Sequence, residues 1–148
     1  MDRALVAAVD LARKHMRGRW PNDAAMLREL RRARAIVDAG VSVNLTEAQR
    51  AALTLFAAEV GPGERGAAHV GSNDKLKAGA DGFVMYATGA PSGIRMAIEA
   101  GAWARVAEMI RRWKGGYDSI GSQIRRALMA NMVQPETKLD EVMRWEKT

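Results

Sequence analysis

Apolar residues recur at intervals of three and four along most of this 148-residue chain, and a glycine or proline stands near the end of most such runs. This spacing places apolar side chains on one face of an α-helix, whereas a half-buried strand needs strict alternation. The expected fold class is therefore all-α, a helical bundle of about six or seven helices. The pattern predicts helices over 2–17, 23–39, 46–60, 92–114, 119–133 and 136–146.

The helix expected at 23–39 separates apolar from cationic residues. Its apolar stripe consists of Met26, Leu30, Ala33 and Val37. The arginines that lie mostly off this stripe, and are expected to be solvated, are Arg28, Arg31, Arg32 and Arg34. Gly40 is expected to end the helix. The next helix begins with Thr46-Glu47-Ala48-Gln49, a match to the capping box in which Thr46 and Gln49 bond each other's backbone.

Two later helices are expected to carry apolar seams. In the helix at 92–114 the seam has spacings of three, four and three, and it is suited to pack against another helix or another chain. Gly101 is a point where this helix can kink. The seam residues are Trp103, Val106, Ile110 and Trp113. In the helix at 119–133, the apolar residues at four-residue spacing are Ile120, Ile124, Leu128 and Met132.

Glycines concentrate in the middle of the chain, between residues 61 and 93. We expect loops and short helices there, at 73–79 and 82–88, with a short strand as the alternative at 82–88 because its apolar run is too short to decide. The chain is interpreted as a single helical domain over 1–148. The sequence also allows two lobes, 1–60 and 91–148, joined by the Gly-rich stretch 61–90.

The sequence offers little of the chemistry that catalytic and metal sites need. It contains no cysteine, and neither of its two histidines, His15 and His69, has a second ligand at metal-binding spacing. No Gly-x-Ser-x-Gly elbow and no Gly-x-x-x-x-Gly-Lys-Ser/Thr loop occurs. We therefore expect no metal, no cofactor and no enzyme activity. No apolar run is long enough to cross a membrane and the start shows no signal-peptide pattern, so a cytoplasmic protein is expected.

The charge is strongly basic and unevenly spread. The net charge is +6 at pH 7, with a pI of about 10.2. Residues 1–40 contain nine Lys or Arg against five Asp or Glu, and residues 91–133 contain seven against three. The planar fork of arginine matches phosphate oxygens. This pattern favours a polyanionic partner, the RNA or DNA backbone, and the alternative is an ordinary solvated helix face.

The candidate nucleic-acid-binding residues lie in three segments, which we expect to form one continuous track. These segments are the end of the first helix, the outer face of the second, and the end of the helix at 92–114 together with the following helix. The cations would neutralise phosphates, and Tyr117 or Trp20 would stack on an unpaired base unless they belong to the core. The candidates are Arg13, Lys14, Arg17, Arg28, Arg31, Arg32, Arg111, Arg112, Lys114, Tyr117, Arg125 and Arg126.

One part of the chain resembles a known enzyme family. Residues 45–53, followed by Phe56 and Val60-Gly61, are similar to a helix in the C-terminal lobe of phage-type muramidases, and Gly93-Ile94-Arg95 with Glu99 resembles that family's closing helix. The resemblance implies cell-wall hydrolysis. The family's catalytic glutamate lies in a preceding lobe, before a Thr-Ile-Gly-x-Gly-His strand that this sequence lacks. What the resemblance implies here is a lobe without its acid catalyst, with Glu59 and Glu64 as the nearby carboxylates to test.

In size, charge and helix content, the whole chain resembles the small subunits of multi-subunit (class 1) CRISPR effector complexes. That resemblance implies sequence-independent binding of a nucleic-acid backbone within a ribonucleoprotein for antiviral defence, without catalysis. It also implies docking to larger protein subunits, or to copies of itself, through apolar helix faces such as the Trp103–Trp113 seam. A phage structural or adaptor protein, in which the basic faces are only solvated surface, is a further alternative.

Overall fold

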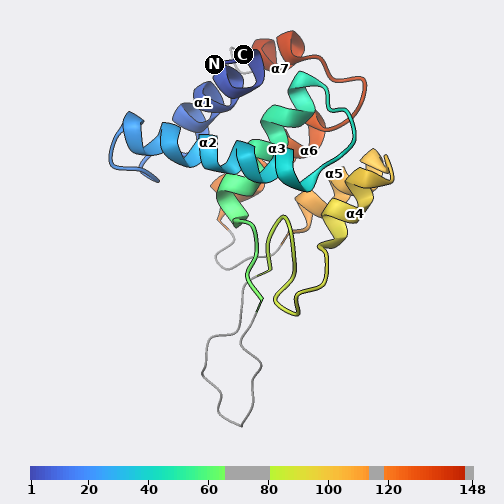
Figure 1. Cartoon of the computed structure of the whole chain (residues 1–148). Coiled ribbons are helices and arrows are strands. Elements are labelled where there is room, and N and C mark those ends of the chain that lie inside the picture. The colour runs from blue at the N-terminus through green and yellow to red at the C-terminus, as the bar shows by residue number, and fades with distance from the viewer. Residues whose placement is uncertain (66–80, 114–118, 146–148) are drawn as a thin grey trace.

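The computed structural model describes residues 1–65, 81–113 and 119–145, and this part of the chain is all-helical (Figure 1). It contains no strand beyond an isolated bridge between Met85 and Pro91. The all-α prediction is thereby confirmed. No helix in the described segments combines the length and apolarity that a membrane crossing requires. The helices are α1 (Arg3–His15), α2 (Asp23–Gly40), α3 (Glu47–Val60), α4 (Gly93–Glu99), α5 (Trp103–Arg111), α6 (Ile120–Met132) and α7 (Leu139–Trp145).

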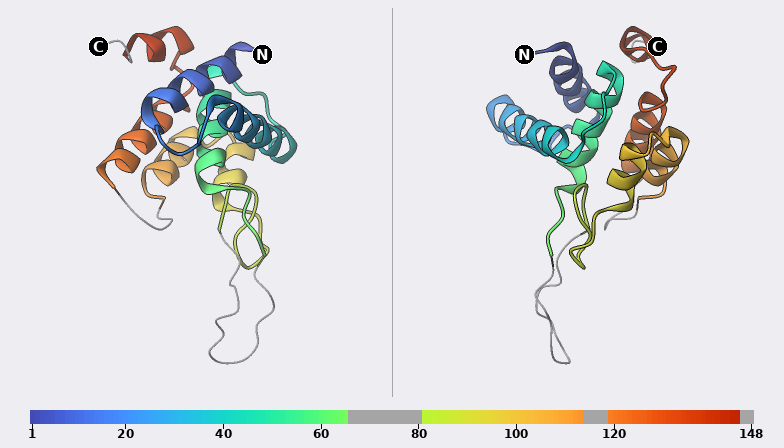
Figure 2. Two further views of the ribbon diagram at one scale, coloured as in Figure 1. Left: turned by 90° about the vertical axis from the view of Figure 1, so that its left-hand side faces the viewer. Right: turned by 45° about the vertical axis from the view of Figure 1, so that its right-hand side comes forward.

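Helix α3 is the centre of the bundle. Every residue from Ala51 to Ala58 is buried, because α3 packs against α1, α2, α6 and α7. Helix α2 covers one side of α3, while α6 packs on the other and in turn carries α5. The N-terminal helices α1 and α2 therefore lie on one side of α3, and α4, α5 and α6 lie together on the other (Figure 2).

The local signals at α2 and α3 are confirmed. The four predicted stripe residues of α2 are all buried, and the helix runs through Gly40, one residue past the predicted end, with Val41 as its C-cap. At α3, the backbone N–H of Gln49 donates to Thr46 Oγ1 over 3.0 Å and the backbone N–H of Thr46 donates to Gln49 Oε1 over 2.9 Å, which completes the capping box. These signals depend on neighbours within one or two helical turns, so the tertiary structure does not override them.

The single helix predicted at 92–114 is wrong, because the structure divides it into α4 and α5. Gly101 has φ +68°, a left-handed conformation that suits glycine, and it ends α4 in a Schellman motif. The N–H of Ala102 donates to Ala97 O and that of Gly101 to Ile98 O. The break turns α5 so that Val106 and Ile110 are fully buried, and the Trp113 ring meets Phe56 edge-on with centroids 5.2 Å apart. The middle of the Trp103–Trp113 seam is thus covered within the chain, while Trp103 and Trp113 are half-buried and pack against the core.

The predicted apolar face of α6 is correct at the end of the helix, where Met132 is buried and Leu128 packs against the core, and wrong at its start. Ile120 and Ile124 are 76% and 55% exposed, whereas Ser122 and Arg126 are buried. Near these residues, Arg125 reaches inward to Glu59 on α3, a partner 66 residues away. An ion pair between distant segments leaves no trace in the periodicity of α6.

Between α3 and α4 the chain leaves the bundle, and its two described segments there, 61–65 and 81–92, are irregular and bond to each other. The N–H groups of Phe83 and Val84 donate to Gly61 O and Pro62 O. A Cβ on Gly82 would lie 2.1 Å from the Gly63 backbone nitrogen, so this close approach needs glycine. Residues 82–88 form neither the helix nor the strand considered from the sequence, and the helix considered at 73–79 lies outside the described residues.

Candidate nucleic-acid interface

In the third predicted segment, the structure withdraws the two arginines of α6 from the surface. Arg125 is half-buried: its Nη2 donates to Glu59 Oε1 and to Ser122 Oγ, each over 2.9 Å, and its Nη1 donates to His15 O over 3.3 Å. Arg126 is only 7% exposed. Arg125 therefore attaches α6 to α3 and to the end of α1. Lys114 and Tyr117 lie outside the described residues.

The two arginines at the end of α5 are exposed but share an acidic neighbour. Glu108 Oε1 lies 2.5 Å from Arg112 Nε, and Glu108 Oε2 lies 3.8 Å from Arg111 Nη1. Arg111 Nη2 also donates to Asn131 Oδ1 over 3.3 Å. A phosphate that bound here would compete with Glu108 for both guanidinium groups.

The outer face of α2 is different, because its cations are exposed and mostly without carboxylate partners. Arg28, Arg31 and Arg32 stand three and four residues apart, so they share one side of the helix. Among the described residues, Arg28 and Arg31 have no ion pair. Arg32 is 76% exposed and has a loose contact of 3.9 Å with Glu29.

The turn between α1 and α2 contains a further exposed cation, near the start of α2. Arg17 is exposed and, within the described chain, has no ion pair. Arg13 is bound to the start of α2, because its Nη2 donates to Asp23 Oδ2 over 3.1 Å. Lys14 is exposed and interacts within the chain. We call Arg17, Arg28, Arg31 and Arg32 the α1–α2 arginine face.

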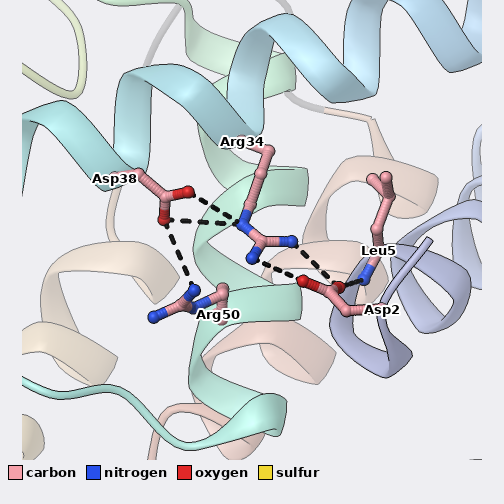
Figure 3. Close-up of polar contacts among 5 residues, drawn as sticks. All are labelled: Asp2, Leu5, Arg34, Asp38 and Arg50. Carbon is pink, nitrogen blue, oxygen red and sulfur yellow. Dashed lines mark hydrogen bonds and ion pairs between the residues drawn. The ribbon is translucent and has the colours of Figure 1, made fainter.

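Arg34, expected to be solvated, has a structural role that the sequence did not indicate. Its side chain is only 16% exposed and forms a bidentate pair with Asp2, with distances of 3.0 and 2.6 Å, while its Nε donates to Asp38 (Figure 3). Arg50 of α3 approaches Asp38 to 3.7 Å. The hydrogen bonds from Arg34 and from the Leu5 backbone lower the pKa of Asp2 from its ordinary 3.8 to about 2. The network ties α1, α2 and α3 together, and Asp2 and Arg34 are 32 residues apart in sequence.

An open groove of about 840 Å³ lies between the end of α2 and α4, but its polar groups are engaged within the chain. Glu99 accepts hydrogen bonds from Ser42 N over 2.6 Å and from Ser42 Oγ over 2.5 Å, and these bonds lower the pKa of Glu99. Arg95 Nε donates to Gly40 O over 2.7 Å. These contacts attach α4 to the connection between α2 and α3.

The basic residues therefore form two separate groups rather than one track. The α1–α2 arginine face lies on α2 and the turn before it, and Arg111 and Arg112 lie at the end of α5, on the other side of α3. Within the described residues, no group of three His, Cys, Asp or Glu side chains is arranged to hold a metal ion.

Comparison of the chain with protein-family models, with curated proteins and with solved structures finds no match.

Proposed function

We propose that this chain binds the phosphate backbone of a nucleic acid, without catalysis and without sequence preference, through the α1–α2 arginine face. The observation that supports this is the absence of carboxylate partners for Arg17, Arg28 and Arg31 in the described chain, which otherwise pairs many of its arginines. Three exposed guanidinium groups on adjacent segments each offer a fork that fits phosphate oxygens.

The proposal extends to a role as a small subunit of a ribonucleoprotein complex, for which the resemblance to CRISPR small subunits is the support. Backbone binding through a few cations suits such a role, because the larger complex supplies sequence recognition. No base-reading module accompanies the arginines in the sequence.

The experiment is a fluorescence-anisotropy titration with single-stranded RNA and duplex DNA at two salt concentrations. If three phosphates are neutralised, duplex affinity falls by about 40-fold between about 50 and 200 mM salt. The variant Arg28→Glu/Arg31→Glu is expected to lower affinity by more than about tenfold and to reduce the salt slope by about two. The absence of binding at low salt to either polymer would reject the function.

The matched control is Arg111→Glu/Arg112→Glu, which changes the net charge equally at exposed positions on the other side of the bundle. It is expected to leave the salt slope close to that of the unmodified chain. Equal losses in both variants would show that binding depends on net charge alone, and the assignment to the α1–α2 arginine face would then be wrong.

Cell-wall hydrolysis, the alternative drawn from the muramidase resemblance, has less support among the described residues. A general acid needs a carboxyl group free to protonate the glycosidic oxygen. Glu59 is instead bound to Arg125 over 2.9 Å, and Glu64 is fully at the surface of the segment that leaves α3. Clearing of a cell-wall suspension that is lost in Glu59→Gln or Glu64→Gln would establish hydrolysis and replace the binding proposal.

A further inference from the structure

A cavity of about 260 Å³ opens at the turn between α1 and α2, beside the α1–α2 arginine face. Its apolar wall includes Met16 and Met26, which belong to the core, and its polar rim includes Arg17 and Asn22. The volume is below the ~300–1,000 Å³ of pockets that hold drug-sized ligands. It therefore suits a single ring system rather than a larger molecule.

Trp20 lines this cavity and is held in position by its neighbours. The indole is half-buried and packs against the core. The guanidinium carbon of Arg19 lies 5.7 Å from its ring centroid, and Arg19 Nη2 donates to Ala58 O at the end of α3 over 2.9 Å. An aromatic ring fixed in this way loses little conformational freedom when a second ring stacks on it.

The rim carries both hydrogen-bonding types and a cation. Asn22 Oδ1 accepts from the Ala25 backbone over 2.8 Å, and no bond from its amide Nδ2 is seen in the described chain. The Asp23 carboxylate accepts from Arg13 and stays largely exposed, which leaves it able to accept further bonds. An amide donor and a carboxylate acceptor beside an aromatic ring match the edge and the face of a nucleobase, and Arg17 matches the attached phosphate.

We propose that this cavity takes one unpaired nucleobase against Trp20, while Arg17 and the rest of the α1–α2 arginine face hold the adjacent phosphates. The inference rests on the proposed function and adds to it a preference for single strands. A base inside a duplex is paired and stacked on both sides, so it cannot enter without being flipped out.

The test compares three probes in anisotropy titrations at one low salt concentration: a short single-stranded oligothymidylate, an abasic strand of equal length, and the corresponding duplex. The two single strands carry the same phosphates and differ only in their bases. Oligothymidylate is expected to bind about tenfold more tightly than the abasic strand, the scale of one base stacked on an aromatic side chain. This comparison uses the unmodified chain and does not depend on any variant folding.

Two variants then assign the preference to Trp20. Trp20→Leu keeps apolar bulk without a π face and is expected to abolish the preference for oligothymidylate while leaving the affinity for the abasic strand unchanged. Trp20→Phe is expected to retain most of it. Thermal unfolding followed by circular dichroism identifies the variants that remain folded.

The outcomes separate the two proposals. Equal affinity for the oligothymidylate and abasic strands would overturn the cavity assignment and leave backbone binding in place. A preference that persists in folded Trp20→Leu would also overturn it, because the base would then bind elsewhere. Failure of all three probes to bind would reject the proposed function itself.

Discussion

Helices α2 and α6 each carry an arginine doublet, Arg31-Arg32 and Arg125-Arg126, and the bundle places the two doublets in opposite surroundings. On α6, Arg125 bonds Glu59, Ser122 and the His15 carbonyl, and Arg126 is buried. On α2, Arg31 is exposed with no ion pair in the described chain, and Arg32 has one loose contact. An arginine doublet in a sequence is therefore no measure of the cationic surface available to a partner.

The difference has an energetic side. On α6, Arg125 bonds groups that are distant in sequence and so contributes to the folded state. On α2, Arg28 and Arg31 have no ion pair in the described chain, and as like charges three residues apart on one helix they repel one another. Charged side chains that do not stabilise the fold are the ones to test for a role in binding.

The largest effect is expected at the α6 side, from Glu59→Gln. This change leaves the Arg125 guanidinium without its counter-charge. The loss is large because Glu59 and Arg125 are only 14% and 20% exposed, so water replaces the missing charge poorly. We expect the free energy of unfolding to fall by about 2–3 kcal/mol, below the full ~3–5 kcal/mol of a completely buried pair. Urea denaturation at pH 7 measures it.

The control for this prediction is the double variant Glu59→Gln/Arg125→Met, which removes both charges and should recover part of the loss. A loss below about 0.5 kcal/mol in Glu59→Gln, the scale of an ordinary surface change, would show that the α6 doublet is as dispensable for folding as the α2 doublet.

The fold was predictable where the signal is local, and the site only in part. The buried stripe of α2 and the Thr46–Gln49 capping box follow from residues within two turns, and both appear as predicted. The inward position of Arg125 depends on Glu59, and that of Arg34 on Asp2, partners far away in sequence. Periodicity indicates which residues of a helix face the core, but it does not indicate which carboxylate of another helix will lie beside them. The sequence therefore predicted both the α2 and the α6 arginine doublets as surface cations, and it could not show that only the α2 doublet stays exposed.

An intermediate loss of stability is expected from Asp2→Asn. This variant tests Arg34, which lies on α2 with the unpaired Arg28 and Arg31 but is itself bound to Asp2. Asparagine keeps the N-cap bond to Leu5 but removes the charge that Arg34 binds. A carboxyl group whose pKa is lowered in the folded chain stabilises it when ionised, but Asp2 is 52% exposed and solvent screens the pair, so the loss at pH 7 is about 1 kcal/mol.

The pH dependence of this variant gives a second check. The folded pKa of Asp2 is about 2 and its ordinary value is 3.8, so its contribution is complete above pH about 4 and is lost as the pH falls through about 2. The unfolding curves of Asp2→Asn and the unmodified chain should converge over that range. Asp10→Asn, at an exposed pair 3.8 Å from Arg13, is the control and should differ little at any pH. A gap that stays at its full size as the pH falls below about 2 would assign the loss to something other than the charge.

The smallest effect has the opposite sign, and it concerns the α2 arginines directly. Arg28→Gln removes the repulsion of Arg28 with Arg31 and with Arg32, which lie three and four residues along the helix, and should raise the free energy of unfolding by about 0.3–0.5 kcal/mol at low salt. The gain should shrink as added salt screens the charges. Arg13→Gln, which loses the pair with Asp23, is the matched control and should not stabilise. If Arg28→Gln stabilises the fold and also weakens nucleic-acid binding, the α2 arginines reduce stability but support binding, as expected of a binding surface. If the variant is no more stable than the unmodified chain, the repulsion on α2 is already relieved, and the contrast with α6 loses its energetic basis.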